Sequence, residues 1–223
     1  MSRPKLVFSR PLQDITQVVG KWAQAMAGKA QALGHSPDHI EIEAKLGRIQ
    51  SDHSSSFSEY IVPDTQQSRF SSEISQEQFG VLQAQLASRP VVIAHADTVD
   101  LIFNNHIRTT LVNGSPIETI QKIRLGDLNV CNPNYPLDWR VSSSLELPCQ
   151  PPPQSTQPVM MRTKKRTSYT LTPLRIDLTV VTKEQNGQLS TTYEAEVEIL
   201  PQAQKSIETI DLLVSTIQAM SRR

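Results

Sequence analysis

The length and charge of this chain exclude several classes of protein. Its 223 residues are enough to bury a substantial core as one domain, and its 22 basic and 22 acidic residues cancel. No overall field therefore points to nucleic acid or membrane as a partner, and any function that depends on charge must come from local segregation. We expect a single domain over residues 1–223, with an N-terminal arm at 1–11 and a Pro-rich loop at 148–161.

The apolar runs and the cysteines of the sequence indicate which classes of protein do not fit this chain. No apolar run approaches the roughly 20 residues that a membrane helix needs, and the N-terminus lacks the apolar core of a signal peptide. The two cysteines, Cys131 and Cys149, form no CxxC pair, which weighs against a structural zinc site or a disulfide scaffold. We expect a soluble, intracellular protein without membrane contact.

Three segments have the spacing of amphipathic helices. The first covers residues 15–33, and the last covers residues 207–220 at the C-terminus. Between them, Ser75 and Gln78 have the spacing of a capping box, which predicts a helix over residues 76–88. Three helices thus frame the chain.

Eight segments alternate between apolar and polar residues, as is typical of strands. The turns VNGSP and EQNGQ are the strongest hairpin signals, and the polar run SDHSSSFSE is predicted to be a loop. The expected strands are Ile40–Ile49, Val91–Phe103, Ile107–Val112, Ile117–Leu128, Trp139–Leu147, Arg162–Leu171, Arg175–Thr182 and Ser190–Leu200. The pattern favours a mainly β (α+β) protein built from antiparallel hairpins.

Charges of one sign gather on single faces of these strands. Because strand side chains of one parity share a face, Glu41, Glu43 and Lys45 lie on one side of the first strand, opposite apolar residues only. The last strand repeats this pattern with Glu194, Glu196 and Glu198. Basic residues on shared polar faces are Arg108, Lys122, Arg124, Arg140, Arg162, Lys164, Arg166 and Arg175.

Two interpretations of these charged faces remain open. Each face can simply point to water, as one side of an antiparallel sheet commonly does. Solvated faces usually mix signs, however, because like charges at neighbouring positions repel. If the sheet closes into a barrel of about eight strands with its polar faces inward, the three helices can cover the apolar outside. Acidic and basic clusters would then face each other in the lumen.

An acidic cluster that faces a basic cluster indicates which kinds of ligand the lumen can bind. Crowded carboxylates have raised pKa values unless a cation is present, and their oxygens suit Mg²⁺ or Mn²⁺. The basic cluster needs an anion with several charges. A nucleotide or an RNA 5′-triphosphate, bridged to the carboxylates by the metal, satisfies both clusters.

Five ordered motifs carry a family resemblance: EIEAKLG, DWRVSSSLELP, RTKKRTSY, RIDLTVV and YEAEVEI. From about Ile40 to Ile199 the chain resembles the fungal-type mRNA-capping RNA 5′-triphosphatases of the triphosphate tunnel metalloenzyme superfamily. The resemblance implies a closed eight-stranded antiparallel β-barrel, the triphosphate tunnel, with a charged interior and flanking α-helices. It also implies metal-dependent removal of the γ-phosphate from nascent mRNA to leave a 5′-diphosphate, with an NTPase side activity.

The resemblance also assigns roles to residues within these motifs. Metal ligands for Mg²⁺ or Mn²⁺ are implied at Glu41, Glu43 and Glu198. Phosphate contacts are implied at Arg108, Lys122, Lys164 and Arg166, with Arg162 and Arg175 as further substrate-binding residues. Glu146 is our first choice to orient the attacking water and Glu196 our second, while Asp177, Thr179 and Glu194 match supporting positions of the tunnel wall.

Several of these residues have a structural alternative. Glu146 can form a salt bridge to an arginine of the wall, and Arg175 with Asp177 can brace their strand as a same-face pair. Leu46 stands where the family often has Phe. The five histidines are expected to be structural or to face solvent.

Function and partners have alternatives as well. The ExExK pattern is shared with inorganic tripolyphosphatases and other tunnel-fold triphosphatases, and a non-catalytic polyphosphate- or RNA-binding module would keep the same basic cluster. The resemblance implies nuclear localisation, a homodimer, and triphosphate-ended RNA or nucleoside triphosphates as substrates. It also suggests the mRNA guanylyltransferase or the transcription machinery as partners, although this chain begins close to the catalytic motifs, without the long N-terminal region that some members use for recruitment.

Overall fold

The computed structural model describes residues 15–50, 60–62, 69–153, 155–185 and 188–222. Three predicted features lie outside these residues. They are the arm at 1–11, the polar run at 51–59 and the Asn-Gly tip of the EQNGQ turn.

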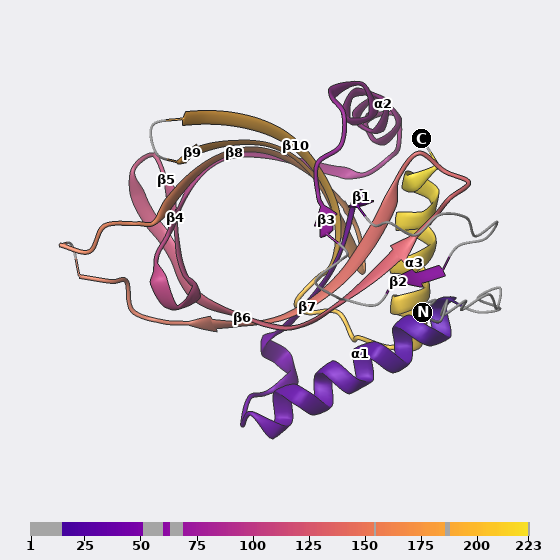
Figure 1. The fold of residues 1–223 in the computed structure, drawn as a ribbon, viewed down its shortest axis with the longest axis horizontal. Coiled ribbons are helices and arrows are strands. Elements are labelled where there is room, and N and C mark those ends of the chain that lie inside the picture. Colours follow the sequence, from indigo (N-terminus) through magenta and orange to yellow (C-terminus); the bar gives the residue numbers. More distant parts are fainter. Residues whose placement is uncertain (1–14, 51–59, 63–68, 154, 186–187, 223) are drawn as a thin grey trace, which may run out of the picture.

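Eight long antiparallel strands close into a barrel (Figure 1). They are β1 (Ile40–Gln50), β4 (Val92–Ile102), β5 (Ile107–Val112), β6 (Ser115–Cys131), β7 (Asp138–Pro148), β8 (Met160–Leu171), β9 (Leu174–Gln185) and β10 (Gln188–Ile199). Their order around the barrel is β1, β10, β9, β8, β4, β5, β6, β7, and β1 pairs with both β10 and β7. This double pairing closes the ring and confirms the predicted eight-stranded barrel.

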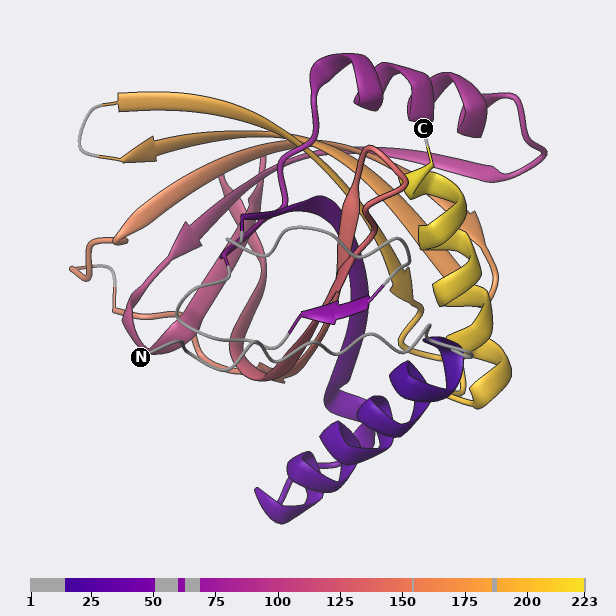
Figure 2. The ribbon, with the colours of Figure 1, turned by 45° about the vertical axis from the view of Figure 1, so that its right-hand side comes forward.

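Three helices lie outside the barrel (Figures 1 and 2). Helix α1 (Ile15–Ala32) packs on α3 (Ile207–Ser221), both contact β1 and β7, and α2 (Gln76–Ala87) contacts β10. The predicted capping box is present, because the Ser75 side chain accepts a hydrogen bond from the Gln78 amide and the Gln78 side chain accepts one from the Ser75 amide. The prediction of three flanking helices is confirmed. None of the described helices has the length and apolar character required to cross a membrane.

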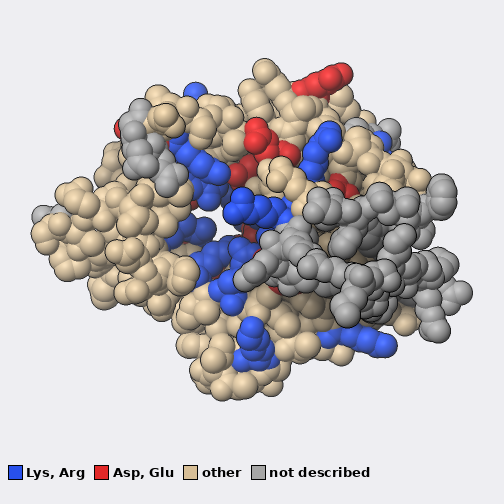
Figure 3. Space-filling view, in the orientation of Figure 1, with Lys and Arg blue, Asp and Glu red and all other residues tan. Residues whose placement is uncertain are grey.

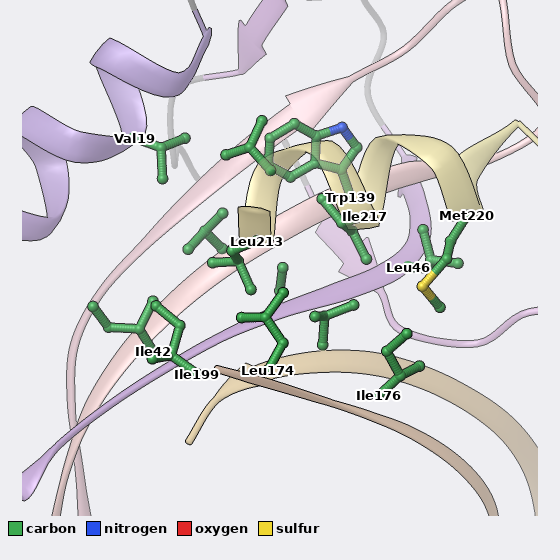
Figure 4. Close-up of a cluster of buried hydrophobic side chains, with 14 of the residues drawn as sticks. Val19, Ile42, Leu46, Trp139, Leu174, Ile176, Ile199, Leu213, Ile217 and Met220 are labelled. Carbon is green, nitrogen blue, oxygen red and sulfur yellow. The ribbon is translucent and has the colours of Figure 1, made fainter. Parts of the chain in front are cut away.

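The main apolar core lies between α3 and the outer face of the barrel (Figure 4). Ile42 and Leu46 of β1 and Ile199 of β10 belong to this core together with Leu213 and Ile217 of α3. Burial of such side chains stabilises a fold by about 1.5–3 kcal/mol each. Because neighbours along a strand alternate between faces, the charged residues between these apolar ones point into the lumen.

The connections between strands follow the sequence less closely than the strands do. The Pro-rich segment joins β7 to β8, but Pro148 still belongs to β7 and Met160 already belongs to β8, so the loop is shorter than the predicted 148–161. Two 3₁₀ turns, η1 (Pro37–His39) and η2 (Asn104–His106), precede β1 and β5.

Strand boundaries also differ from the prediction in places. β6 begins at Ser115, ahead of its predicted start, because the turn residues Asn113 and Gly114 adopt positive φ angles of 49° and 79° and let pairing begin at once. Two short strands, β2 (Tyr60–Val62) and β3 (Arg69–Ser71), pair with β6 and β1. The sequence does not predict them, since three residues carry too little alternation to be recognised.

Candidate active site in the tunnel

The lumen of the barrel is a charged cavity of about 340 Å³, which is within the usual range of ligand pockets, about 300–1,000 Å³. On the face shown in Figure 3, Lys and Arg side chains surround the opening of the tunnel. The charged residues that line the cavity are Glu41, Glu43, Lys45, Asp100, Arg108, Glu118, Lys122, Glu146, Arg162, Lys164, Arg166, Arg175, Glu194, Glu196 and Glu198.

Carboxylates of β1 and β10 form one side of the cavity, termed the acidic wall: Glu41, Glu43, Glu194, Glu196 and Glu198. In the pairing of these strands, Glu43 lies opposite Glu198. Both are almost fully buried, with 4% and 9% of their surface exposed. Like charges directly opposite each other on neighbouring strands repel. The structure thus brings together the carboxylates that the sequence analysis grouped, and their charge must be balanced locally.

Lys45 supplies part of that balance. Its ammonium nitrogen lies 2.8 Å from Glu196 and 3.3 Å from Glu43. Burial alone would lower the pKa of Lys45, but these two carboxylates outweigh it and raise the pKa above its ordinary value. Burial alone would raise the pKa of Glu196, but Lys45 and Arg166 hold that pKa well below its usual range. Glu196 is therefore ionised at neutral pH.

Two other carboxyl groups of the acidic wall, Glu41 and Glu198, have raised pKa values, in contrast to Glu196. Burial, and then the nearby carboxylate of Glu43, raise the pKa of Glu41 to about 8, although the Lys122 ammonium contacts it. Burial raises the pKa of Glu198 to about 7, against the attraction of the Arg175 guanidinium at 2.5 Å. These two carboxyl groups lack sufficient positive charge around them at neutral pH.

The donor chemistry of the acidic wall fits a hard divalent cation. Carboxylate oxygens are preferred ligands of Mg²⁺ and Mn²⁺, and a cation among Glu41, Glu43 and Glu198 would relieve the repulsion that contributes to the raised pKa values. Within the part of the chain that the structure describes, no three such side chains converge into a formed metal centre. Each carboxylate contacts a Lys or Arg instead, so the side chains would have to turn toward the ion.

Cations of β5, β6 and β8 form the facing side, termed the basic wall: Arg108, Lys122, Arg162, Lys164 and Arg166. The Lys164 ammonium is 2.7 Å from the carboxylate of Asp100. Burial lowers the pKa of Lys164, Asp100 opposes this effect, and the neighbouring guanidinium groups of Arg166 and Arg108 lower the pKa further. These three cations line the same cavity, so they face one shared space in which an anion could bind.

Glu146 and the Arg175–Asp177 pair both form the ion pairs that are the structural alternatives to their predicted roles. Glu146 contacts Arg108 at 3.3 Å and Lys122 at 3.1 Å. Arg175 and Asp177 form the expected pair at 3.0 Å. Asp177 has no exposed surface, whereas the other predicted site residues all line the cavity. A bracing role is therefore well supported for Asp177.

Two acidic residues of the lumen are missed by the sequence analysis. Asp100 of β4 is 1% exposed, forms an ion pair with Lys164 and accepts a hydrogen bond from Thr110 at 3.0 Å. Glu118 of β6 also lines the cavity. Neither strand segment carries a run of like charges around these residues, so parity gave no signal. Asp100 shares a strand face with Thr98, but the sequence does not show that this face of β4 points into the lumen.

A third acidic residue, Asp127, turns inward because the register of β6 shifts between Arg124 and Gly126. Asp127 contacts Arg124, lies 3.3 Å from Arg140 and accepts a hydrogen bond from Ser142 at 2.7 Å. A glycine inside a predicted strand is the available signal of such a bulge. Without the shift, parity would place Asp127 on the outer face.

The sequence matches a known family over most of its length. Residues 9–212 match the family model described as mRNA capping enzyme, beta chain. The mRNA-capping enzyme subunit beta of Cryptococcus neoformans is 27% identical over 85% of this chain and 54% of its own length. The same subunit of Schizosaccharomyces pombe is 27% identical over 73% and 62%. The polynucleotide 5′-triphosphatase CTL1 of Saccharomyces cerevisiae is 27% identical over 79% and 65%. The chain thus spans 54% to 65% of the length of these relatives.

Solved structures share the fold. The Pct1 RNA triphosphatase of Schizosaccharomyces pombe superposes with a TM-score of 0.80 at 23% identity, covering 99% of both chains. A second structure of that protein, in complex with the Spt5 CTD, gives the same TM-score. The closed barrel that the sequence motifs predict is thus also the fold of this solved RNA triphosphatase. On the match over residues 9–212, this chain belongs to the family of the mRNA capping enzyme beta chain.

Proposed function

We propose that this protein is a metal-dependent RNA 5′-triphosphatase that removes the γ-phosphate from nascent mRNA and leaves a 5′-diphosphate, the first step of capping. The proposal depends mainly on one observation: the acidic wall and the basic wall face each other inside a closed barrel. Family membership supports it, as does the name of one relative, a polynucleotide 5′-triphosphatase.

The basic wall provides the site for the γ-phosphate. Lys164, Arg166 and Arg108 line the same cavity and would bind a phosphate there through charge-assisted hydrogen bonds. Lys122, Arg162 and Arg175 extend the same set along the triphosphate. In the transition state of phosphoryl transfer, negative charge gathers on the oxygens around the phosphorus, and fixed cations there lower the barrier.

The acidic wall provides the site for the metal. Glu41, Glu43 and Glu198 would hold Mg²⁺ or Mn²⁺, which when bound draws charge from a phosphate oxygen. Lys122 and Arg175 contact Glu41 and Glu198, so they would move from carboxylate to phosphate when substrate and ion enter. Such an exchange of partners keeps every charge compensated in both states.

A carboxylate must orient the water that attacks the γ-phosphorus opposite the bond to the β-phosphate oxygen. We assign this role first to Glu146, whose side chain is 25% exposed and whose only ion-pair contacts in the described chain are Arg108 and Lys122. Glu196 is the second choice, because Lys45 and Arg166 already occupy its oxygens. The water forms the new P–O bond, the bond to the β-phosphate oxygen breaks, and the water's proton passes to phosphate or carboxylate.

Release of ³²P from γ-labelled RNA in the presence of Mg²⁺ or Mn²⁺ tests the proposal. Parallel assays with ATP and inorganic tripolyphosphate, read by malachite green, separate it from a tripolyphosphatase. The control is the Glu43→Ala/Glu198→Ala double variant in the same buffers. Release from RNA no faster than in this control would contradict the proposal. Tight RNA binding without any release would then indicate a binding module.

The setting of the reaction is proposed from the relatives. Two of them are named mRNA-capping enzyme subunit beta, and Pct1 has been solved in complex with the Spt5 CTD. We propose that this chain works in the nucleus as a homodimer with the mRNA guanylyltransferase or the transcription machinery. Light scattering tests the dimer, and pull-down with purified guanylyltransferase and with an Spt5 CTD peptide tests the partners.

A further inference from the structure

The two mouths of the tunnel differ in charge, because cations gather at one of them. One end of the tunnel is termed the basic mouth. Strands β1, β6 and β9 end there, and strands β7, β8 and β10 begin there. Its inward-facing cations are Lys45, Arg124, Arg140, Arg162 and Lys183, with Glu194 and Asp127 as acidic neighbours. Toward the opposite mouth the carboxylates of Glu41, Glu118, Glu146 and Glu198 are matched in number by the cations of Arg108, Lys122, Arg166 and Arg175.

Most cations of the basic mouth already have acidic partners. Arg124 and Arg140 both contact Asp127, and Lys45 lies between two carboxylates of the acidic wall. Lys183 differs from them, because among the described residues no carboxylate lies within ion-pair distance of it. It is therefore the cation at this mouth that is available to a ligand.

Lys183 lies directly opposite Arg162 in the pairing of β8 with β9, so the two side chains share the lumen face. Arg162 is itself weakly partnered. Its carboxylate contact, Glu194, is 3.6 Å away, and its buried Nε has no hydrogen-bond partner in the described part of the chain. Two like charges opposite each other are unfavourable unless an anion lies between them. Their chemistry is that of a phosphate contact.

We propose that the RNA chain passes through the basic mouth, where Lys183 and Arg162 contact the phosphodiesters that follow the triphosphate end. The inference rests on the proposed function and deepens it. A polyanion is attracted by the cations of this mouth, whereas carboxylates match the cations toward the opposite mouth, and entry from this side directs the triphosphate toward the acidic wall. Inorganic tripolyphosphate has no attached chain, so it makes no use of Lys183. Lys183 is accordingly a specificity residue for RNA.

The test compares two charge reversals on the same pair of strands, Lys183→Glu and Lys165→Glu. Lys165 is the matched control, because it is exposed and has the opposite parity to the inward-facing Lys164 of β8. Binding of a short fluorescent triphosphate-ended RNA is measured by anisotropy over a range of salt concentrations. Lys183→Glu should weaken binding about tenfold and reduce the salt slope by about 0.7, the value for one lost phosphate contact on a single strand. Lys165→Glu should change neither.

Tripolyphosphate hydrolysis provides the second readout, and Lys183→Glu should leave its rate unchanged. Equal RNA affinity in Lys183→Glu and the unmodified protein would overturn the proposed path. A parallel loss of tripolyphosphate hydrolysis would also overturn it, because Lys183 would then belong to the γ-phosphate site. If the unmodified protein releases no phosphate from RNA, the proposed function fails, while the binding comparison still decides the path.

Discussion

The two walls of the tunnel differ in what lies behind them. The acidic wall on β1 and β10 is backed by helices, with α3 packed on both strands and α2 on β10. Strands of the basic side leave much of their outer face in water, where Ile93 of β4 and Met161 of β8 are 43% and 37% exposed. The wall whose charges repel most strongly is thus the one with the apolar core behind it.

This difference has a physical reason. Carboxylates such as Glu43 and Glu198, placed opposite each other, destabilise the pairing of their strands, and only tertiary packing can hold them in place. Leu213 and Ile217 of α3 are fully buried against the back of these strands and supply that packing. The basic wall needs less support, because Asp100, Glu146 and Glu196 neutralise its cations within the lumen.

Removing a carboxylate from the acidic wall should have the largest effect. Glu41→Gln, Glu43→Gln and Glu198→Gln should each lower kcat about 1,000-fold, since each removes a proposed metal ligand at the site of charge development. Their melting temperatures should stay constant or rise, because each change removes a repelling charge. Phosphate release, thermal melting and Mn²⁺ titration by electron paramagnetic resonance measure these effects. Full activity in any one variant would remove that residue from the metal site.

Changes in the basic wall come next. Lys164→Ala and Arg166→Ala should lower kcat/KM for triphosphate-ended RNA by a few hundredfold, because each removes a cation that we propose stabilises the transition state. Lys165→Ala, the neighbour with the opposite parity, is the control and should retain full activity. Steady-state kinetics with RNA and with ATP provide the comparison. A defect confined to metal affinity would argue against a phosphate contact.

Glu146→Gln separates the two roles left for that residue. If Glu146 orients the water, kcat should fall about 100-fold while KM for RNA stays constant. If it only fixes Arg108 and Lys122, KM should rise instead, because the phosphate site loses its order. Glu196→Gln under the same conditions tests the second choice. The split between kcat and KM decides between the assignments.

The backing of the acidic wall can be tested through stability. Leu213→Ala should lower the free energy of unfolding by about 3 kcal/mol, because it opens a cavity in a fully packed core. Ile93→Ala, on the outer face of the basic side, should cost less than about 1 kcal/mol because 43% of the residue's surface is already exposed to water. Urea unfolding followed by circular dichroism measures both. Equal losses would show that the two walls are supported alike.

The smallest expected effect is on the pH dependence of the metal-free protein. Glu41 and Glu198 have folded-state pKa values of about 8 and about 7, above their ordinary value, so the folded chain binds protons that the unfolded chain does not. Their protonation stabilises the fold at low pH, and this contribution is lost as pH rises through about 7 to 8. In EDTA, the melting temperature should therefore rise by a few degrees from about pH 8 to about pH 5.

Two comparisons control this measurement. Saturating Mg²⁺ at the higher pH should restore the lost stability, because the ion replaces the protons as the countercharge. Glu41→Gln should flatten the pH profile, since the amide does not titrate. A melting temperature that stays constant over this range in EDTA would contradict the raised pKa values.

Much of the barrel is predictable because alternation is a strong signal in long strands. All eight barrel strands and all three helices are predicted, and parity alone puts Glu43 and Lys164 on the lumen side. The parts that the sequence does not reveal depend on register between strands. Asp127 turns inward through a bulge, and the pairing of Lys183 with Arg162 follows from the alignment of β8 with β9.

Ion-pair partners are the other part that the sequence leaves undetermined. Lys45 belongs to the same motif as Glu43, but nothing in the motif shows that its ammonium contacts Glu196 from the far end of the chain. Asp100 has no like-charged neighbour at the next positions of its strand face, and its role is visible only from the ion pair that it forms with Lys164. Such ion pairs form only when strands distant in sequence come together in the barrel, and no local sequence pattern reveals them.

The pairing of β1 with β10 joins an early strand of the chain to its last strand. A chain emerging from the ribosome therefore has two of its three proposed metal ligands, Glu41 and Glu43, long before the third, Glu198, is synthesised. Contacts between segments so distant in sequence form late and slowly during folding. Translation that stops short of residue 188 would yield a product with an unclosed ring and without the proposed ligand Glu198, and a fragment carrying β10 and α3, supplied separately, would be needed to complete both.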